Sequence, residues 1–228
     1  MPYAAPPARY DGTPHRFGLR RGSCLWRVHS RQYGARAFKS RLTDPLFGGA
    51  RFDATEADPY PFCYAALEET TALAETLLRD IAADERAMRV LPDRALAGRQ
   101  LSALTLVRDL ELVRLISGQD LAAIGQDHWL VSASGPEYAQ TRGWGHWLRR
   151  QAGWAHGFIW SSLRDRDGLA IILFGDRCAA AFGPDYERAL LHEVPELAVD
   201  LDDEFGAEWL NRRLEPYRVA ARYPKAGG

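Results

Sequence analysis

One short stretch of the chain, residues 48–75, carries the signals of several elements in close succession. It opens with a glycine pair and Arg51, passes through an acidic loop bounded by prolines, and continues into the apolar run Phe62–Ala66, which predicts a strand. Two glutamates then begin a predicted helix that carries Glu75. Because strand, turn and helix follow so quickly, we expect Arg51, Tyr64 and Glu75 near one end of a sheet, where binding sites are often built.

The size of the chain limits it to one domain or at most two small ones, because it has 228 residues. Hydrophobic residues make up 46% and charged residues 26% of the chain, the usual proportions of a globular protein with a sizeable core. The net charge of −1 leaves no basic surplus for DNA, RNA or an anionic membrane surface. We therefore expect neither direct nucleic-acid binding nor membrane binding.

The cysteines and the lack of a targeting signal favour the cytoplasm. Cys24, Cys63 and Cys178 are widely spaced and odd in number, which fits a reducing compartment better than a disulfide framework. No segment has the apolar core of a signal peptide, and the longest strongly apolar run, Leu169–Phe174, is far too short to span a bilayer. The sequence therefore predicts a soluble cytoplasmic protein.

Several further segments read as strands. Residues 23–29 predict the first strand, and residues 101–116 alternate apolar and polar side chains in two halves, which predicts two short strands or a hairpin. Residues 158–163 and 169–174 are apolar runs separated by a tight turn that contains Asp-Gly. These last two runs give the clearest hairpin of the chain.

Helices are expected in the second half of the chain, at residues 137–150, 186–192 and 205–214. The first of these carries Trp144 and Trp147, for which packing in the core is the favoured interpretation. We expect the chain to divide into an irregular N-terminal arm (1–22), a core (23–176) and a C-terminal helical extension packed on the same domain (177–228).

Common catalytic motifs do not explain these residues. The glycines at 143 and 145 do not continue to a third glycine or follow a strand, so they are no dinucleotide-binding fingerprint. His192 lacks a second histidine at helical spacing, and the histidines do not cluster with cysteines or acids, so we expect no metal site. Ser134 and Ser162 lack the glycines of a nucleophile elbow.

Two arginines lie in or beside predicted strands and need a counter-charge. Arg27 lies within the first strand, and Arg51 follows two glycines. A buried arginine needs either an acidic partner or a bound anion. For Arg27 and Arg51, a salt bridge to Glu75 or Asp53 and a role in ligand binding are therefore equally favoured interpretations.

Periodicity alone gives the other polar residues structural roles. Glu75 falls at the border of the apolar face of its helix, so a surface ion pair with Arg79 is favoured. For Tyr64 and Ser162, each taken singly, a packed ring and a satisfied hydroxyl are favoured.

In their order and context, these residues resemble the RES domain family, named for Arg, Glu and Ser. The resemblance covers residues 23–174 and rests on four segments. Leu25–Val28 is similar to the family's opening apolar-aromatic-Arg strand, and Gly49–Phe52 is similar to its Gly-x-Arg-aromatic segment. Cys63–Glu75 is similar to its Tyr-x-Ala strand with the Ala-x-x-Glu helix, and Gly157–Ser162 is similar to its Gly-x-x-aromatic-x-Ser strand. Trp160 stands where the family usually has Tyr. Ser162 matches the family serine, with Ser161 as the alternative in the neighbouring register.

The resemblance implies an α+β fold similar to ADP-ribosyltransferase toxins, with a split β-sheet core and flanking helices. It also implies that NAD is consumed as a substrate, through cleavage of the nicotinamide–ribose bond, with no cofactor and no metal. Inorganic phosphate (a phosphorylase) or water (a glycohydrolase) would accept the ADP-ribose. The alternatives are a protein ADP-ribosyltransferase and a non-catalytic nucleotide-binding module.

The resemblance also assigns roles to residues. Glu75 would stabilise the positive charge that develops on the ribose. Arg27 and Arg51 would bind the pyrophosphate or an incoming phosphate, because a guanidinium matches those oxygens. Tyr64 would stack on nicotinamide or hold the ribose, and Ser162 would hydrogen-bond the ribose or support Glu75.

Many members of the family are toxins of toxin–antitoxin pairs. The resemblance therefore implies an antitoxin partner with an Xre-type helix-turn-helix. The sequence leaves open whether the chain forms a homo-oligomer or a hetero-oligomer with that antitoxin.

Overall fold

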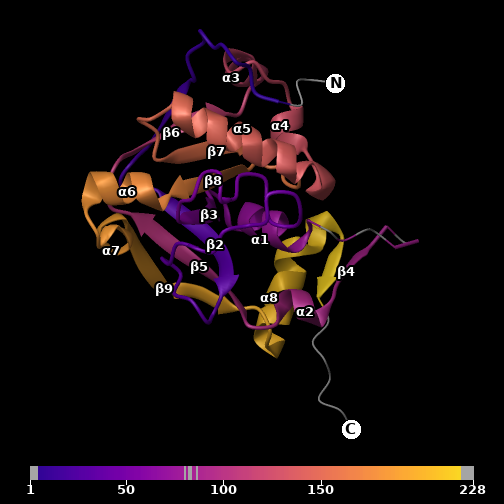
Figure 1. Cartoon of the computed structure of the whole chain (residues 1–228). Coiled ribbons are helices and arrows are strands. Elements are labelled where there is room, and N and C mark those ends of the chain that lie inside the picture. The colour runs from indigo at the N-terminus through magenta and orange to yellow at the C-terminus, as the bar shows by residue number, and fades with distance from the viewer. Residues whose placement is uncertain (1–4, 80, 82–83, 86, 222–228) are drawn as a thin grey trace.

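A curled mixed sheet organises the computed structural model, which describes residues 5–79, 81, 84–85 and 87–221 (Figure 1). Its strands lie in the order β1-β6-β7-β8-β3-β2-β5-β9. Their bounds are β1 Arg16–Leu19, β2 Cys24–Ser30, β3 Phe62–Ala66, β5 Arg99–Leu106, β6 Leu110–Leu115, β7 Gly157–Ser161, β8 Leu169–Phe174 and β9 Leu191–Asp200. A separate parallel pair joins β4 (Arg89–Leu91) to β10 (Val219–Ala221).

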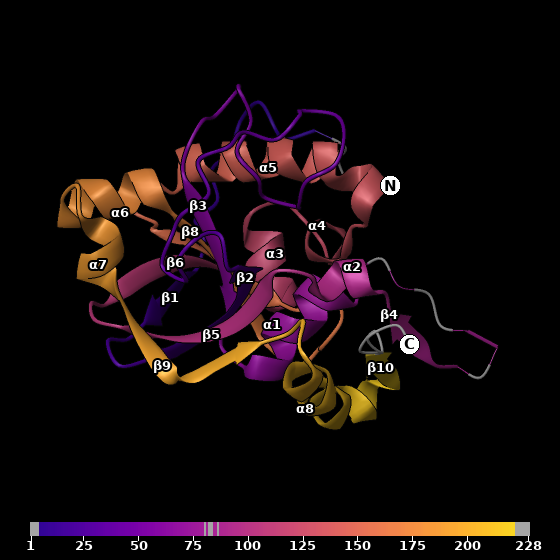
Figure 2. The same ribbon diagram turned by 90° about the horizontal axis from the view of Figure 1, so that it is seen from below.

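Helices flank the sheet, as the views in Figures 1 and 2 show. The helix α5 (Tyr138–Gln151) runs across one side of the sheet, together with the shorter α3 (Gly118–Ala123) and α4 (Trp129–Ser132). The other helices are α1 (Glu69–Leu77), α2 (Asp93–Leu96), α6 (Gly175–Phe182), α7 (Tyr186–Leu190) and α8 (Glu204–Leu214). Among the described residues, every helix is too short or too polar to cross a membrane.

A bent two-stranded ribbon gives the sheet its curl. β1 pairs with β6 and β2 pairs with β5, and the register is the same in both ladders: Leu19 lies opposite Leu110, and Cys24 lies opposite Thr105. Between the two ladders, the strand formed by β1 and β2 bends at Gly22, whose φ of 86° suits glycine. The strand formed by β5 and β6 bends at residues 107–109. Each long strand therefore crosses from one part of the sheet to the other.

Of the two alternatives predicted for residues 101–116, the two short strands are confirmed and the hairpin is wrong. β5 and β6 do not pair with each other, because they are successive parts of one bent strand whose partners are β2 and β1. The alternation of side chains fixes which residues are extended, but it carries no information about the neighbouring strand.

The sheet is split between β2 and β3. These strands share one pair of opposed residues, Trp26 and Ala66, and then separate. Beyond that point Lys39 forms a bridge with Phe62, so a loop replaces β2 as the neighbour of β3. The separation leaves a wedge between the two strands.

Apolar side chains fill three regions around the curled sheet. One side of β7 and β8, with Phe158, Trp160 and Phe174, packs against Trp144 and Trp147 of α5, as predicted for these tryptophans. The opposite faces of these strands lie inside the bend, and a third cluster joins α1 and α8 to the sheet.

The predicted β2, β3, α1 and α5, and the hairpin of β7 and β8, are confirmed. In the outer segments the predicted helices are confirmed as α7 and α8, but two strands were not expected. Within residues 1–22, expected to be an irregular arm, Arg16–Leu19 form β1, and within residues 177–228, expected to be helical, Leu191–Asp200 form the edge strand β9. Both strands are completed by pairing with distant residues, which local sequence does not reveal. Residues 1–4 and 222–228 lie outside the described residues.

Candidate functional site

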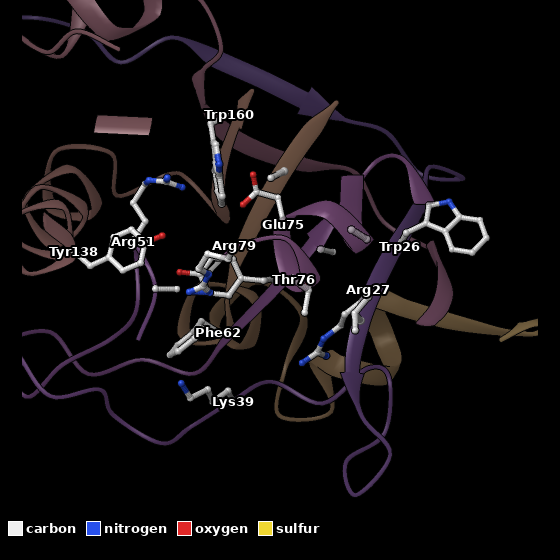
Figure 3. A pocket seen from close by; sticks show the side chains of 16 residues that line it. Trp26, Arg27, Lys39, Arg51, Phe62, Glu75, Thr76, Arg79, Tyr138 and Trp160 are labelled. Atoms are coloured by element: carbon white, nitrogen blue, oxygen red, sulfur yellow. The ribbon is translucent and has the colours of Figure 1, made fainter. Parts of the chain in front are cut away.

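The wedge between β2 and β3 opens into a pocket of about 240 Å³ (Figure 3). Its walls come from β2, from β3, from α1, from the loop around Arg51, from the first residue of α5 and from β7. Four of the five predicted site residues line it, namely Arg27, Arg51, Tyr64 and Glu75. The fifth, Ser162, lies immediately behind Glu75.

Glu75 is held through one of its two carboxylate oxygens. Oε1 accepts a hydrogen bond of 2.6 Å from Ser162 Oγ and another of 3.1 Å from the backbone N–H of Leu163. No described residue donates to Oε2. One oxygen therefore fixes the carboxylate, and the other is available to a ligand.

The hydroxyl of Ser162 has no capacity left for a ligand. Ser162 is 2% exposed, and its Oγ accepts from the backbone N–H groups of Arg164 (3.1 Å) and Asp165 (3.0 Å). Both lone pairs are thereby used, so its single proton is directed to Glu75. Within the described part of the chain, Ser161, the alternative in the register, makes no such contact.

The turn after β7 also fixes the helix that carries Glu75. Asp165 accepts a hydrogen bond of 2.6 Å from Thr71 Oγ1, in the first turns of α1. A Cβ at Gly168 would overlap the same Thr71 oxygen, so the close approach requires glycine there. The hairpin and α1 are locked together on both sides of the carboxylate.

Arg51 is a buried cation with little compensation. It is 5% exposed, its Nη2 donates to Ala133 O at 3.0 Å, and its Nε has no hydrogen-bond partner among the described residues. Burial lowers the pKa of Arg51 from its ordinary value, although an arginine remains charged in proteins. No carboxylate of the described residues lies within 4 Å of it.

The loop that presents Arg51 is shaped by glycine. Gly49 has a φ of 73°, and a Cβ there would meet Thr43 and the carboxylate of Asp53. Arg142 donates to Gly48 O at 2.8 Å, and Thr141 Oγ1 donates to Arg51 O at 2.9 Å. Two adjacent residues of α5 therefore hold the Gly-Gly-Ala-Arg segment in place.

Two further arginines of the pocket also donate only to backbone carbonyls, whereas Lys39 lies 3.5 Å from Asp53 Oδ2. Arg27 Nη1 donates to Ala35 O and Ala37 O, each at 2.7 Å, and Arg79 Nη1 donates to Gly49 O at 3.0 Å. The ion pairs considered for Arg27, Arg51 and Glu75 are therefore not formed within the described part of the chain. Positive charge exceeds negative charge at this site.

Tyr64 contributes its ring to the wall of the pocket. Its hydroxyl donates to Asp53 Oδ1 at 3.0 Å and accepts from the backbone N–H of Phe52 at 3.1 Å. Burial, followed by the charge of Asp53, raises the pKa of Tyr64 well above its usual value. The phenol therefore stays protonated and engaged with the protein.

The lining residues that were not among the predicted site residues include Lys39, Arg79, Tyr138 and Trp160. Tyr138 could have been placed, because Ser134 and Glu137 form a capping box around the 3-10 turn that leads directly into α5. Trp160 was noted only as a departure from the family pattern. It is 2% exposed, and no described residue forms a hydrogen bond with its Nε1.

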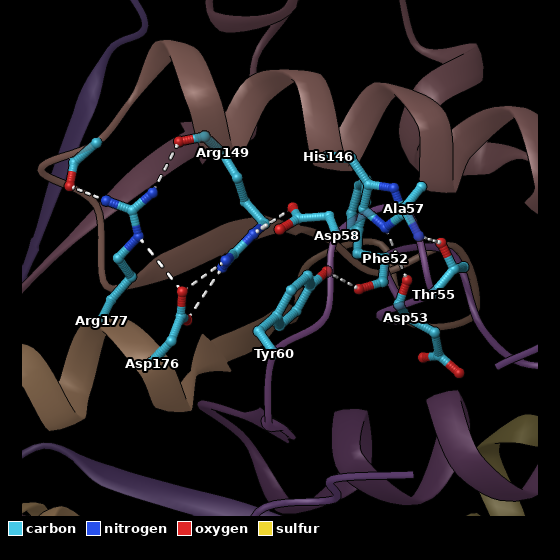
Figure 4. Close-up of polar contacts among 11 residues, drawn as sticks. Phe52, Asp53, Thr55, Ala57, Asp58, Tyr60, His146, Arg149, Asp176 and Arg177 are labelled. Atoms are coloured by element: carbon cyan, nitrogen blue, oxygen red, sulfur yellow. Dashed lines mark hydrogen bonds and ion pairs between the residues drawn. The ribbon is translucent and has the colours of Figure 1, made fainter. Parts of the chain in front are cut away.

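A second group of charges lies on the far side of the same loop (Figure 4). Arg149, with 4% of its side chain exposed, donates from Nε to Asp58 Oδ2 and from Nη2 to Asp176 Oδ2, both at 2.8 Å. Its guanidinium carbon lies 3.6 Å from the centroid of the Tyr60 ring. Both carboxylates and the ring fix this arginine, which does not line the pocket. In the part of the chain described, no group of three or more His, Cys, Asp or Glu could hold a metal ion.

The family model described as RES domain matches residues 24–217. The match runs well past residue 176, where we expected the core to end. The fold is similar to that of a chain in the crystal structure of the MbcT–MbcA toxin–antitoxin complex of M. tuberculosis, with a TM-score of 0.50 and 15% identity over 81% of this chain and 86% of that chain. The predicted α+β fold, with a split mixed sheet and flanking helices, is confirmed. No curated protein matches the sequence.

Proposed function

Because the chain belongs to the RES domain family, we propose that it degrades NAD by breaking the bond between nicotinamide and ribose. Phosphate or water is the acceptor of the ADP-ribose. NAD is a substrate in this reaction and no cofactor takes part.

The observation that carries the proposal is the imbalance of charge in the pocket. Arg27, Arg51 and Arg79 line it without a carboxylate partner among the described residues, whereas its one lining carboxylate, Glu75, is held by a serine and a backbone N–H. Cations in this state need an anionic ligand, and a pyrophosphate offers oxygens that match guanidinium groups. A single fixed carboxylate suits a reaction that develops one positive charge.

The chemistry assigns Glu75 to the ribose. When the bond between the ribose C1 and the ring nitrogen breaks, its electron pair leaves with nicotinamide and the ribose carbon becomes positive. An oxygen of phosphate or water then forms a bond to that carbon, and water also loses a proton. The free Oε2 of Glu75 stabilises the developing charge or orients the acceptor.

Ser162 acts through Glu75. Since its hydroxyl is saturated by Arg164, Asp165 and Glu75, we assign it to positioning the carboxylate, one of its two predicted roles. Tyr64 acts through its ring, as a stacking surface for nicotinamide or the ribose, because its hydroxyl is engaged by Asp53 and Phe52.

We further propose that the chain is the toxin of a toxin–antitoxin pair, in the cytoplasm, with an Xre-type antitoxin as partner. Its family and its structural likeness to a chain of a toxin–antitoxin complex support this role. Co-expression with the product of the adjacent gene would test it. Growth arrest that the neighbour does not relieve would contradict the pairing.

Nicotinamide release tests the enzymatic proposal directly. Purified protein is incubated with NAD, with and without phosphate, and release is measured. Release in either condition is expected; dependence on phosphate identifies phosphorolysis, and label transferred to protein would instead identify a protein ADP-ribosyltransferase. No release in both conditions would contradict the proposal.

Glu75→Gln should lower turnover by about 100- to 1,000-fold, since it removes the charge that stabilises the transition state. Glu68→Gln is the matched control, because Glu68 is exposed at the start of the same helix and does not line the pocket. Equal turnover in the Glu75→Gln variant and the wild type would exclude Glu75 from the reaction.

A further inference from the structure

The pocket contains a second tyrosine whose state differs from that of Tyr64. Tyr138 is the first residue of α5, is 7% exposed and lines the same pocket. Among the described residues, none forms a hydrogen bond with its hydroxyl. In Figure 3 its side chain extends from α5 toward the middle of the pocket. Its hydroxyl is therefore free to bind a ligand, unlike that of Tyr64.

Two guanidinium groups lie close to this ring. The guanidinium carbons of Arg51 and Arg79 are each 5.7 Å from the centroid of the Tyr138 ring. Each arginine donates one hydrogen bond to a backbone carbonyl, and Nε of the buried Arg51 has no partner in the described structure. The two like charges repel each other, which lowers the pKa of Arg51 in addition to the larger effect of burial. An anion placed between them would relieve this repulsion.

A phosphate group fits this arrangement best. Three donor groups converge from three separate elements: Arg51 from its glycine loop, Arg79 from beyond α1, and Tyr138 from α5. A phosphate presents several charged oxygens in different directions, whereas a carboxylate presents two oxygens in one plane. Guanidinium and hydroxyl donors both suit such oxygens.

We infer that Tyr138, Arg51 and Arg79 form a binding site for a phosphate group, in which the Tyr138 hydroxyl donates to a phosphate oxygen. The inference rests on the proposed function for the source of the phosphate, which is the pyrophosphate of the dinucleotide or the acceptor phosphate. Tyr138 is thus a specificity-determining residue that favours phosphorylated ligands.

Tyr138→Phe tests the inference, because it removes the hydroxyl and keeps the ring. Binding of ADP-ribose to the full chain is measured by calorimetry, and the KM for inorganic phosphate is measured with NAD. We expect the Kd for ADP-ribose or the KM for phosphate to rise about tenfold or more, as for the loss of a hydrogen bond to a charged group. A rise in the first identifies the dinucleotide pyrophosphate, and a rise in the second identifies the acceptor.

The variant should fold as the wild type does, because the hydroxyl has no partner in the described structure. Equal midpoints of thermal unfolding check this, and Tyr33→Phe, at a tyrosine that is 61% exposed and outside the pocket, is the matched control. Unchanged Kd and KM in the Tyr138→Phe variant would overturn the inference. If the wild type binds ADP-ribose but releases no nicotinamide, the proposed function fails while the calorimetry still decides the role of Tyr138.

Discussion

Arg149 and Arg51 are both buried arginines, yet their surroundings differ. Arg149 is paired with Asp58 and Asp176 and lies against the ring of Tyr60. Arg51 has one bond to a backbone carbonyl and an Nε without a partner among the described residues. The hydrogen bonds and ion pairs of Arg149 raise its pKa despite burial, whereas burial lowers the pKa of Arg51.

The difference separates an arginine that holds the fold from one that awaits a ligand. Arg149 ties together the loop at Asp58, α5 and α6, so its charge is compensated within the chain. The charge of Arg51 lacks such compensation in the part of the chain described, so its burial destabilises the fold. Binding of an anion would offset this loss of stability. Arg149 therefore stabilises the fold, whereas Arg51 destabilises it and is available to bind an anion.

The largest effect is expected when Arg149 is replaced by Leu. Removing one partner of a buried ion pair leaves the others without compensation, which costs about 3 kcal/mol, near the lower end of the usual range because Asp58 and Asp176 are partly exposed. For a chain of this size, the midpoint of thermal unfolding should fall by about 6–12 °C. Arg150→Leu, one residue further along α5 and exposed, is the control and should change the midpoint little. An Arg149→Leu variant as stable as the wild type would show that Arg149 does not hold the fold, and its contrast with Arg51 would then fail.

A smaller effect, of opposite kind, is expected for Arg51→Leu. Its free energy of unfolding should stay the same or rise by about 1 kcal/mol, because an uncompensated buried charge is removed. Its kcat/KM for NAD should fall about 100-fold, which corresponds to about 2.7 kcal/mol of transition-state binding. Thermal unfolding and nicotinamide release measure the two quantities on the same sample. A loss of stability as large as that of the Arg149→Leu variant would show that Arg51 is structural.

The smallest effect is expected on the pH dependence of stability, and it comes from His146, which lies near Arg149 on α5. His146 is buried on α5, where its Nε2–H donates to Asp53 O at 3.3 Å. Burial lowers the pKa of His146, with Asp58 opposing and Arg149 contributing to the shift. The unfolded chain therefore binds this proton more readily than the folded chain does.

Stability from His146 is present above the unfolded pKa of about 6.5 and is lost as pH falls through the lower folded pKa. The denaturant midpoint should thus be lower at acidic pH than at neutral pH, and His146→Gln, which keeps a donor, should flatten part of that dependence. His29 and His156, whose pKa values burial also lowers, should contribute to the remaining slope. An unchanged slope in the His146→Gln variant would show that His146 does not contribute.

Sequence patterns predicted the strands and helices that local signals determine. The Asp-Gly turn gave the hairpin of β7 and β8, and the apolar run at Phe62–Ala66 gave β3. The bent ribbon could not be predicted, because pairing of residues 16–19 with residues 110–113 depends on contacts far apart in sequence.

The site could be predicted only in part, and Glu75 shows why. Periodicity indicated a surface ion pair with Arg79, whereas the resemblance to a family placed Glu75 in a site. The structure places it in the pocket with Ser162 as its partner, and Arg79 contacts Gly49 instead. Tyr138 and Lys39 reach the pocket through the folding of α5 and of the loop after β2, which no single motif records.

The long separation between Glu75 and its supports has a consequence for the chain as it is made. Ser162 and Leu163 follow Glu75 by 87 and 88 residues. At a synthesis rate of about 5–20 residues per second, these partners are added about 4–18 s after the carboxylate. Through that interval the nascent chain has Glu75 but nothing that fixes its orientation. A ribosome that stops before the hairpin of β7 and β8 therefore releases a fragment that lacks the assembled site. The complete pocket can form only when translation is well past its midpoint.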